Sequence, residues 1–255
     1  MEHHIRLHLT TVAIVVSLGI AVSVITSTAV AARAYQARSK DVVRQNQTIT
    51  VKGSTRERLQ SDRAVWNIGV RGEGKTPQAA FAVLDAAVQR VQQFLKQAGF
   101  QDAEIGVCAI DTETQHGQDA KGKPTHEIVG YALTRGFVIT TGDVQRVQQS
   151  AGRVTELLQD GVLVTSKAPA YYYTKLAQLK IDLMAAASAD ARARADKIAA
   201  ATGCRLGTLR DAQMGVLQIT RPDSTEVADY GLYDTTTIDK DVTAVVTVTF
   251  GIRAD

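Results

Sequence analysis

The longest run of apolar and small residues, from Leu9 to Ala32, carries no formal charge. About 20 such residues are enough for an α-helix to cross the hydrocarbon core of a bilayer. We therefore expect one N-terminal transmembrane helix, with residues 1–40 forming a membrane anchor and its flanks. A cleaved signal peptide is the alternative, because Ala29 and Ala31 are small residues at the positions that a signal peptidase reads and Arg6 is a positive residue before the run.

Either interpretation exports the rest of the chain. A retained anchor predicts a single-pass protein of the cytoplasmic membrane with an extracytoplasmic, periplasmic C-terminal domain, and cleavage predicts secretion to the periplasm. Four basic residues follow the run and by themselves favour the cytoplasmic side: Arg33, Arg38, Lys40 and Arg44. The charge pattern alone therefore leaves the orientation of the anchor open.

Alternating apolar positions then predict two strands. Residues 49–51 and 64–70 place Ile, Val, Ala or Trp at every second position, as a strand with one buried face requires. We expect these two strands to pair antiparallel. The next apolar residues recur at helical spacing, in a helix that begins with the cap Thr76 and Pro77 and ends at Gly99.

The same two patterns continue along the chain. Strands are expected near residues 104–113 and 127–140, separated by a polar loop over residues 114–126. A second helix is predicted from Asp143 to the stop at Gly161, with Val144, Val147, Ala151, Val154 and Leu158 on its buried side. The third and longest helix is predicted over residues 174–202.

The chain closes with a strand around residues 212–219, an irregular stretch over residues 220–240, and a strand over residues 242–250 in which apolar residues alternate with Thr. Strands in pairs between single helices indicate an α+β fold, with antiparallel sheets covered by three helices and preceded by the N-terminal transmembrane helix. We expect one continuous folded unit over residues 48–252, joined to the membrane by a short tether of residues 41–47.

Four segments of the chain resemble the SIMPL-domain family of bacterial envelope proteins. They are Ile49-Thr50-Val51-Lys52-Gly53, Ala64-Val65-Trp66, the helix end Phe94-Leu95-Lys96-Gln97-Ala98-Gly99-Phe100, and the stretch from Ala187 to Gly207 that ends Gly203-Cys204-Arg205-Leu206-Gly207. The resemblance covers residues 48–252. Cys204 departs from it, because we expect a polar residue at this position in relatives.

The resemblance implies a location and a mode of assembly. Members of the family are envelope proteins, among them a periplasmic immunogenic protein that assembles into a channel-like ring of many subunits, and others are linked to oxidative-stress defence. An extracytoplasmic domain is therefore expected in spite of the basic residues after the apolar run. The resemblance implies no catalytic residue, because none is established for the family.

Charge and motifs exclude several classes of function. Residues 1–40 hold four of the 29 basic residues and one of the 26 acidic ones, which leaves 25 of each in residues 41–255. This part is neutral, and no basic block predicts contact with nucleic acid. The spacing of Gly69, Gly72 and Gly74 favours a turn over a phosphate-binding loop. Without Gly-x-Ser-x-Gly, Cys-x-x-Cys, His-Glu-x-x-His or Walker-type motifs, the sequence predicts no catalytic residue and no bound cofactor.

Two histidines and two cysteines are the residues that could support metal or thiol chemistry. His116 and His126 lie with three carboxylates in residues 111–126, but their spacing matches no compact ligand motif, and the polar composition favours a solvated loop. These histidines are the candidate metal ligands. Cys108 and Cys204 are expected as buried thiols, since a chain of this size does not need a disulfide to fold, and their pairing stays open.

Tyrosines are the candidate interface residues. Tyr171, Tyr172 and Tyr173 stand in a row before the longest helix, so alternation sends the middle side chain to the face opposite its neighbours and exposes at least one of the three. Together with Tyr230 and Tyr233 they offer apolar area with a polar tip, which suits protein interfaces. Packing of the same tyrosines at a sheet edge within one subunit is the alternative.

These observations favour a membrane-tethered, extracytoplasmic, self-associating scaffold or binding protein of the cell envelope, for which the resemblance implies a link to stress defence. Its expected partners are the membrane, through residues 9–32, and further copies of the chain, while the ligand stays unassigned. Two alternatives remain: a metal- or thiol-dependent enzyme that uses the loop of residues 111–126, and a carrier of a small apolar ligand.

Overall fold

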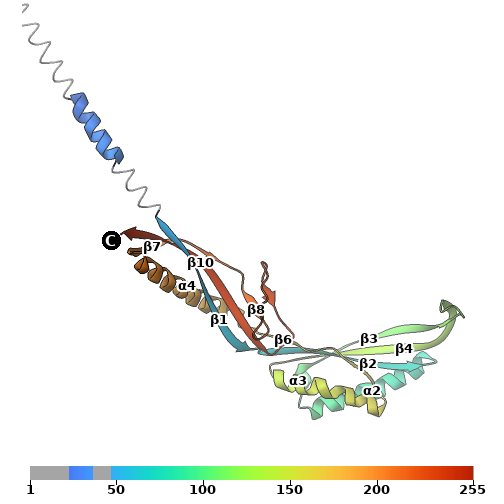
Figure 1. The fold of residues 1–255 in the computed structure, drawn as a ribbon. Coiled ribbons are helices and arrows are strands. Elements are labelled where there is room, and N and C mark those ends of the chain that lie inside the picture. The colour runs from blue at the N-terminus through green and yellow to red at the C-terminus, as the bar shows by residue number, and fades with distance from the viewer. Residues whose placement is uncertain (1–22, 37–46, 255) are drawn as a thin grey trace, which may run out of the picture. The chain divides into compact units, whose positions relative to one another are not determined.

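The computed structural model describes residues 23–36 and 47–254 (Figure 1). The described chain clusters into two compact units. Unit 1 holds the described residues of Met1–Gly53, Ser188–Met214 and Val246–Asp255, and unit 2 holds Ser54–Ala187 and Gly215–Val245. The sequence favours one continuous unit, whereas the structure divides the contacts into two groups that share three long elements. The domain boundaries drawn from the sequence stay predictions.

The fold is α+β, with two antiparallel-rich sheets. The strands are β1 (Thr48–Gln60), β2 (Arg63–Gly74), β3 (Ile105–Gln118), β4 (Pro124–Thr141), β5 (Leu163–Ser166), β6 (Ala170–Tyr172), β7 (Cys204–Met214), β8 (Gln218–Thr220), β9 (Leu232–Tyr233) and β10 (Asp239–Ala254). The helices are residues 23–36, α2 (Pro77–Gln97), α3 (Val144–Arg153) and α4 (Leu176–Ala201), with short 3-10 segments at η1 (Asp102–Glu104) and η2 (Val154–Asp160).

Unit 2 contains the sheet β3-β4-β2-β5, to which β6 adds along β2. Helices α2 and α3 lie on one face of this sheet (Figure 1). Its core joins Trp66 and Ile68 of β2 and Phe137 of β4 to Leu84 and Val91 of α2. The inward positions of β2 alternate as its sequence predicts, so the period-two pattern correctly assigns the buried face.

The expected pairing of the first two strands is wrong. Strand β1 pairs with β10 in one sheet, whereas β2 pairs with β4, β5 and β6 in the other. The link Ser61-Asp62 does not close a hairpin, because Ser61 donates its N–H to Ile238 and Asp62 donates its N–H to Tyr172. Alternation fixes the face of a strand but carries no information about its partner.

The boundaries of α2 are confirmed. Thr76 caps the helix by accepting a hydrogen bond from the N–H of Ala79, Pro77 is the first helical residue, and Gly99 follows the end at φ +88°. The expected glycine turn before the helix is wrong, because Gly72 and Gly74 lie inside β2. A Cβ on Gly72 would lie 2.4 Å from the N of Leu84, so the missing side chain lets α2 approach the strand backbone.

The polar loop expected over residues 114–126 is mostly strand. The β3–β4 ladder continues through Gln115 opposite Gly130 and His116 opposite Ile128, which leaves only residues 119–123 between the strands. This segment contains no buried residue, as its polar sequence implies, but backbone pairing does not require apolar side chains. The two strands continue beyond β2 as a ribbon (Figure 1).

The second helix changes from α-helical to 3-10 winding before it ends. It begins after Asp143, which accepts a hydrogen bond from the N–H of Arg146, and continues from Val154 as a 3-10 helix to Gly161. The tighter winding turns Leu157 inward and leaves Leu158 exposed, so the expected burial of Leu158 is wrong.

The second sheet has the order β1-β10-β8-β9, with β7 also on β10. In unit 2, Leu179 and Leu183 of α4 pack on Val242 and Ala244. In unit 1, α4 buries Ala191, Ala195 and Ala199, and β10 buries Val246, Val248 and Phe250. The boundaries of α4 and the alternation of β10 are confirmed, but the strand expected at residues 212–219 is two strands, and β7 begins at Cys204.

Among the residues described, no helix is both long enough and apolar enough to cross a bilayer. Residues 1–22 and 37–46 lie outside the described chain, so most of the expected anchor and nearly all of the tether do too. Residues 23–36, the end of the apolar run and the four residues after it, are helical with every side chain exposed.

Candidate functional site

The candidate site lies in unit 2, on the face of β2 that is turned away from the core. Ala64 and Trp66 point into the core, so their neighbours Arg63 and Val65 point to the opposite face. Arg63 is exposed, and within the described chain its guanidinium has neither an ion pair nor a hydrogen bond. A guanidinium with five free donors is a group that can bind an anion.

Strand β6 brings the tyrosines to this face. Tyr172 lies directly opposite Arg63 in the β2–β6 ladder, and Tyr171 lies opposite Ala64. Directly opposed residues share a face of the sheet, so the ring of Tyr172 stands beside Arg63, and Tyr171 is buried in the core. Burial raises the pKa of the Tyr171 phenol.

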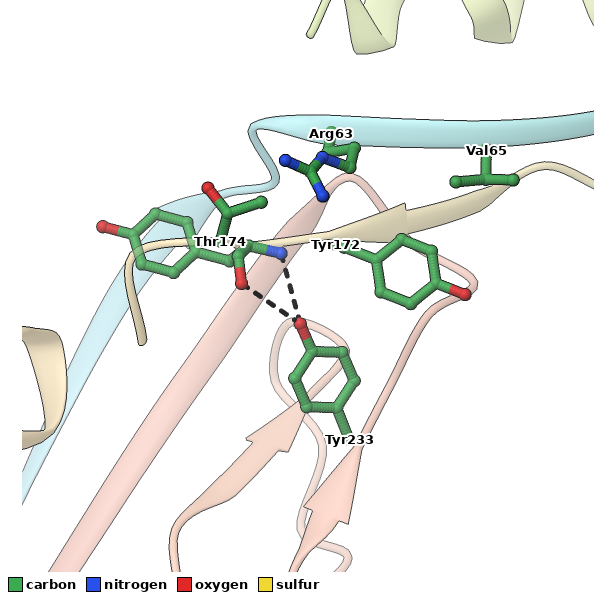
Figure 2. A pocket seen from close by; sticks show the side chains of 6 residues that line it. Arg63, Val65, Tyr172, Thr174 and Tyr233 are labelled. Carbon is green, nitrogen blue, oxygen red and sulfur yellow. Dashed lines mark hydrogen bonds between the residues drawn. The ribbon is translucent and has the colours of Figure 1, made fainter. Parts of the chain in front are cut away.

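Tyr233 arrives from β9 and is fixed by two hydrogen bonds. Its hydroxyl accepts the N–H of Tyr173 at 3.3 Å and donates to the carbonyl of the same residue at 3.3 Å, as the dashed lines in Figure 2 show. The rings of Tyr172 and Tyr233 have centroids 6.3 Å apart and an interplanar angle of 34°. Two tilted rings at this distance stabilise each other and hold the wall in place.

Together these residues line an open pocket of about 490 Å³, which we call the tyrosine pocket. Its lining is Arg63, Val65, Tyr172, Tyr173, Thr174 and Tyr233 (Figure 2). This volume lies within the range of small-molecule sites, about 300–1,000 Å³. No carboxylate is among the lining residues. The carboxylate of Asp62 lies behind the lining residue Thr174, from whose N–H and hydroxyl it accepts hydrogen bonds at 2.8 and 2.9 Å.

A buried lysine supports the segment that carries Tyr233. The ammonium of Lys240, 0% exposed, donates to the carbonyl of Asp234 at 2.6 Å, to its Oδ2 at 3.2 Å and to the carbonyl of Thr237 at 2.9 Å. Burial lowers the pKa of Lys240, and Asp234 opposes this change. Burial would raise the pKa of Asp234, but hydrogen bonds from Thr237 and Thr236 and the charge of Lys240 lower it well below its usual value.

A second buried charge holds the end of β1 to the start of β10. Asp241, 1% exposed, accepts hydrogen bonds from Arg56, from Arg58 at 2.8 and 2.9 Å, and from the N–H of Asp223 at 2.9 Å. Arg58 also bonds Asp223 at 2.6 Å. The bond from Arg58 is the main reason that the pKa of Asp241 lies well below its usual value despite burial.

The structure brings together three of the five candidate tyrosines. Tyr172, Tyr173 and Tyr233 line the tyrosine pocket, whereas Tyr171 belongs to the core and Tyr230, 88% exposed, lies outside the pocket. The expected alternation is confirmed for Tyr171 and Tyr172 by the burial pattern of β6, but Tyr173 lines the same pocket as Tyr172. The expectation that at least one of the three tyrosines in the row is exposed is wrong, because Tyr171 is buried and the other two are half-buried. An interface role for these side chains stays a prediction.

The candidate metal and thiol residues do not gather. His116 and His126 are exposed on β3 and β4, and among the described residues no group of three or more His, Cys, Asp or Glu side chains could hold a metal ion. Both cysteines are free thiols. The expectation that both are buried is wrong, because Cys108 lies exposed at the irregularity of the edge strand β3 and Cys204 is half-buried.

Sequence reasoning missed the charged residues of this region. Nothing in the sequence around Arg63 marks it as a binding residue, because it is simply a polar residue on the outward face of a strand. Lys240 and Asp241 do carry a local signal. They are consecutive residues of a strand whose side chains alternate between two faces, so one of the two charges must occupy the buried face.

Comparison with protein families agrees with the resemblance. The profile of SIMPL, described as a protein of unknown function (DUF541), matches residues 49–250. The chain belongs to the SIMPL family. No curated protein matches this SIMPL chain.

Among solved structures, the ligand-free regulatory subunit of aspartate kinase from Thermus thermophilus is similar at 14% identity. The match covers 76% of this chain and 87% of that one, with a TM-score of 0.20. A likeness at this level carries no argument about the function of the SIMPL chain.

Proposed function

We propose that this SIMPL protein is a membrane-tethered, extracytoplasmic, self-associating scaffold or binding protein of the bacterial cell envelope, with stress defence as the setting that its family suggests. The observation that carries the proposal is an open strand edge. Strand β3, 14 residues long, pairs only with β4 among the described residues, and the backbone groups of its outer side have no strand partner. Such an edge is a template for a strand of another chain.

The usable part of this edge is short and defined. The β3–β4 ladder is regular from Ile110 to Gln115 and irregular on both sides of this window. Bulges reduce indiscriminate pairing at edges, so a window of regular ladder between two irregularities favours one register over many. The edge contains neither Pro nor Lys, the two residues that most often block such pairing.

A second copy of the chain is the occupant that the charges favour. Residues 41–255 are neutral, so copies do not repel each other at long range. Within the window, Arg71 already pairs with Glu113 at 3.1 Å, so only Asp111 keeps an unpaired charge there among the described residues. A strand of another copy therefore meets little electrostatic opposition.

The helix of residues 23–36 supports the tether. It continues the uncharged run of the sequence, and Val24, Ile25 and Val30 are more than half exposed. Apolar side chains exposed along a helix that follows an uncharged run fit a bilayer better than water. We propose that the anchor concentrates the subunits at the membrane surface and that the folded part associates by itself.

Association is tested by light scattering on the detergent-extracted full-length protein and on residues 41–255. Both are expected to give a mass of more than one subunit. Successive residues of a strand direct their N–H groups to opposite sides, so Asp111→Pro and Thr112→Pro form a matched pair. One of them removes a β3–β4 hydrogen bond and lowers the melting temperature, while the other removes an outer donor, leaves the fold intact and should give monomers.

Thr225→Pro, in an exposed loop, is the control and should change neither mass nor stability. A monomeric mass for both wild-type samples would contradict the scaffold proposal. Equal masses for wild type and both edge variants would instead exclude β3 as the contact.

The topology is tested by protease treatment of intact spheroplasts. Digestion of residues 48–255 while a cytoplasmic marker survives is the expected result. Survival of the domain together with the marker would place it in the cytoplasm and contradict the proposal.

A further inference from the structure

We propose that the tyrosine pocket is a binding site for a small monocarboxylate with a flat, apolar body, such as an aromatic carboxylic acid. This proposal does not rest on self-association, because the pocket is built within unit 2 from β2, β6, β9 and the residues after β6. It assigns a ligand class to a surface that the sequence identifies only as tyrosine-rich.

The charge of the site comes from Arg63. Several other arginines of unit 2 have an acidic partner: Arg71 pairs with Glu73, Arg58 with Asp241, and Arg146 with Glu104. Arg63 has no such partner among the described residues, and no acidic side chain lines the pocket. A planar guanidinium matches the two oxygens of a carboxylate, which it can bind through two parallel hydrogen bonds.

The body of the ligand is defined by the apolar side chains that lie next to this charge. Val65 lies two residues from Arg63 on the same face of β2, and the rings of Tyr172 and Tyr233 lie below them (Figure 2). Rings and a branched aliphatic side chain offer apolar area to a flat molecule. The single cation favours a singly charged acid over a phosphate dianion, because phosphate sites usually combine several donors with positive charge.

The wall is fixed before any ligand arrives. Tyr233 is held through both backbone groups of Tyr173, and the next residue, Asp234, is bonded to the buried Lys240. The side chains of Thr236 and Thr237 add two further bonds to Asp234. A binding surface that is already ordered loses less entropy when it binds, so even a small ligand can gain measurable affinity.

The probe is benzoate, titrated into the full-length protein in detergent by ligand-observed NMR or calorimetry. A ligand of this size is expected to bind with a Kd of about 1 mM or tighter. Arg63→Gln should weaken binding by roughly tenfold or more, because it removes the charge-assisted pair. Benzamide, the neutral analogue, should bind about as weakly to wild type as benzoate binds to the variant.

Arg90→Gln is the matched control, because Arg90 is exposed on α2 and also has no ion pair among the described residues. It should bind benzoate like wild type, and both arginine variants should melt like wild type. Tyr172→Leu should weaken benzoate and benzamide by the same factor, since it changes only the apolar wall. Absence of saturable benzoate binding to wild type, or equal binding by Arg63→Gln, would overturn the proposal.

Discussion

The ammonium nitrogen of Lys240 lies 3.2 Å from Oδ2 of Asp234, although the lysine side chain is fully buried. The ammonium has three protons, and the structure provides three acceptors: this carboxylate, the carbonyl of Asp234 and the carbonyl of Thr237. A buried charge is tolerated only when it is paired and hydrogen-bonded in this way. The pair therefore fixes the turn between β9 and β10, next to Tyr233.

Lys240→Met is expected to lower the free energy of unfolding by about 3 kcal/mol, because it leaves a half-buried carboxylate without its counter-charge and two carbonyls without this donor. Urea denaturation monitored by circular dichroism measures the change. Lys180→Met, on the exposed side of α4, is the matched control and should change stability by less than about 0.5 kcal/mol. Equal stability of the two variants would mean that the Lys240 pair does not hold the turn.

Acid is expected to destabilise unit 2 through its buried carboxylates. The pKa values of Asp234 and Asp241 lie below their usual value in the folded protein. Their stabilising effect is therefore complete above about pH 4, the pKa of an aspartate in an unfolded chain, and is lost as the pH falls toward the lower folded values. Urea denaturation at constant ionic strength between pH 6 and pH 3 should show this decline.

Asp241→Asn separates the contribution of Asp241 to the acid sensitivity from that of Asp234. The variant should be less stable than wild type at pH 6, because Asn cannot pair with the charges of Arg56 and Arg58, and its stability should fall less steeply toward pH 3. Parallel pH profiles for wild type and variant would show that Asp241 does not cause the acid sensitivity.

Close packing of α2 on β2 depends on a missing side chain. In Gly72→Ala, the new Cβ would lie 2.4 Å from the N of Leu84 and 2.6 Å from the O of Ala80, so the helix must move. Overpacking of this kind costs about 1–3 kcal/mol. Gly152→Ala is the opposite control, since its Cβ meets nothing within 4 Å and lies in α3, where Ala should stabilise by about 0.5–1 kcal/mol. Thermal melts of both variants check the opposite signs.

Elements with local signals could be predicted from the sequence. The cap Thr76, Pro77 and the final Gly99 define α2 because capping and left-handed turns depend on neighbouring residues. The alternation of β10 gives its buried face for the same reason. Membership of the SIMPL family was also visible in short segments of strand and helix.

Features that depend on distant residues could not be predicted. Strand β1 alternates as expected but pairs with β10, and the function of Gly72 becomes visible only when α2 packs on it. The tyrosine pocket also depends on contacts between residues that are far apart in the sequence. Arg63 meets Tyr172 across a ladder, and Tyr233 bonds a residue 60 positions away, so neither contact leaves a local pattern in the sequence.

Helix α4 offers the last test, because it carries a buried and an exposed apolar residue two positions apart. Leu183 is 2% exposed and packs with Leu179, Ile219 and Val242, whereas Ile181 is 61% exposed on the same helix. Leu183→Asp buries an unpaired carboxylate and should lower the free energy of unfolding by several kcal/mol, roughly 3–5, enough to unfold a marginal domain. Ile181→Asp introduces the same charge into water and should cost less than about 1 kcal/mol. His116→Ala, on the exposed ribbon, should leave stability unchanged. Urea denaturation of the three variants measures the order, and equal loss for Leu183→Asp and Ile181→Asp would mean that α4 does not cover the second sheet through this face.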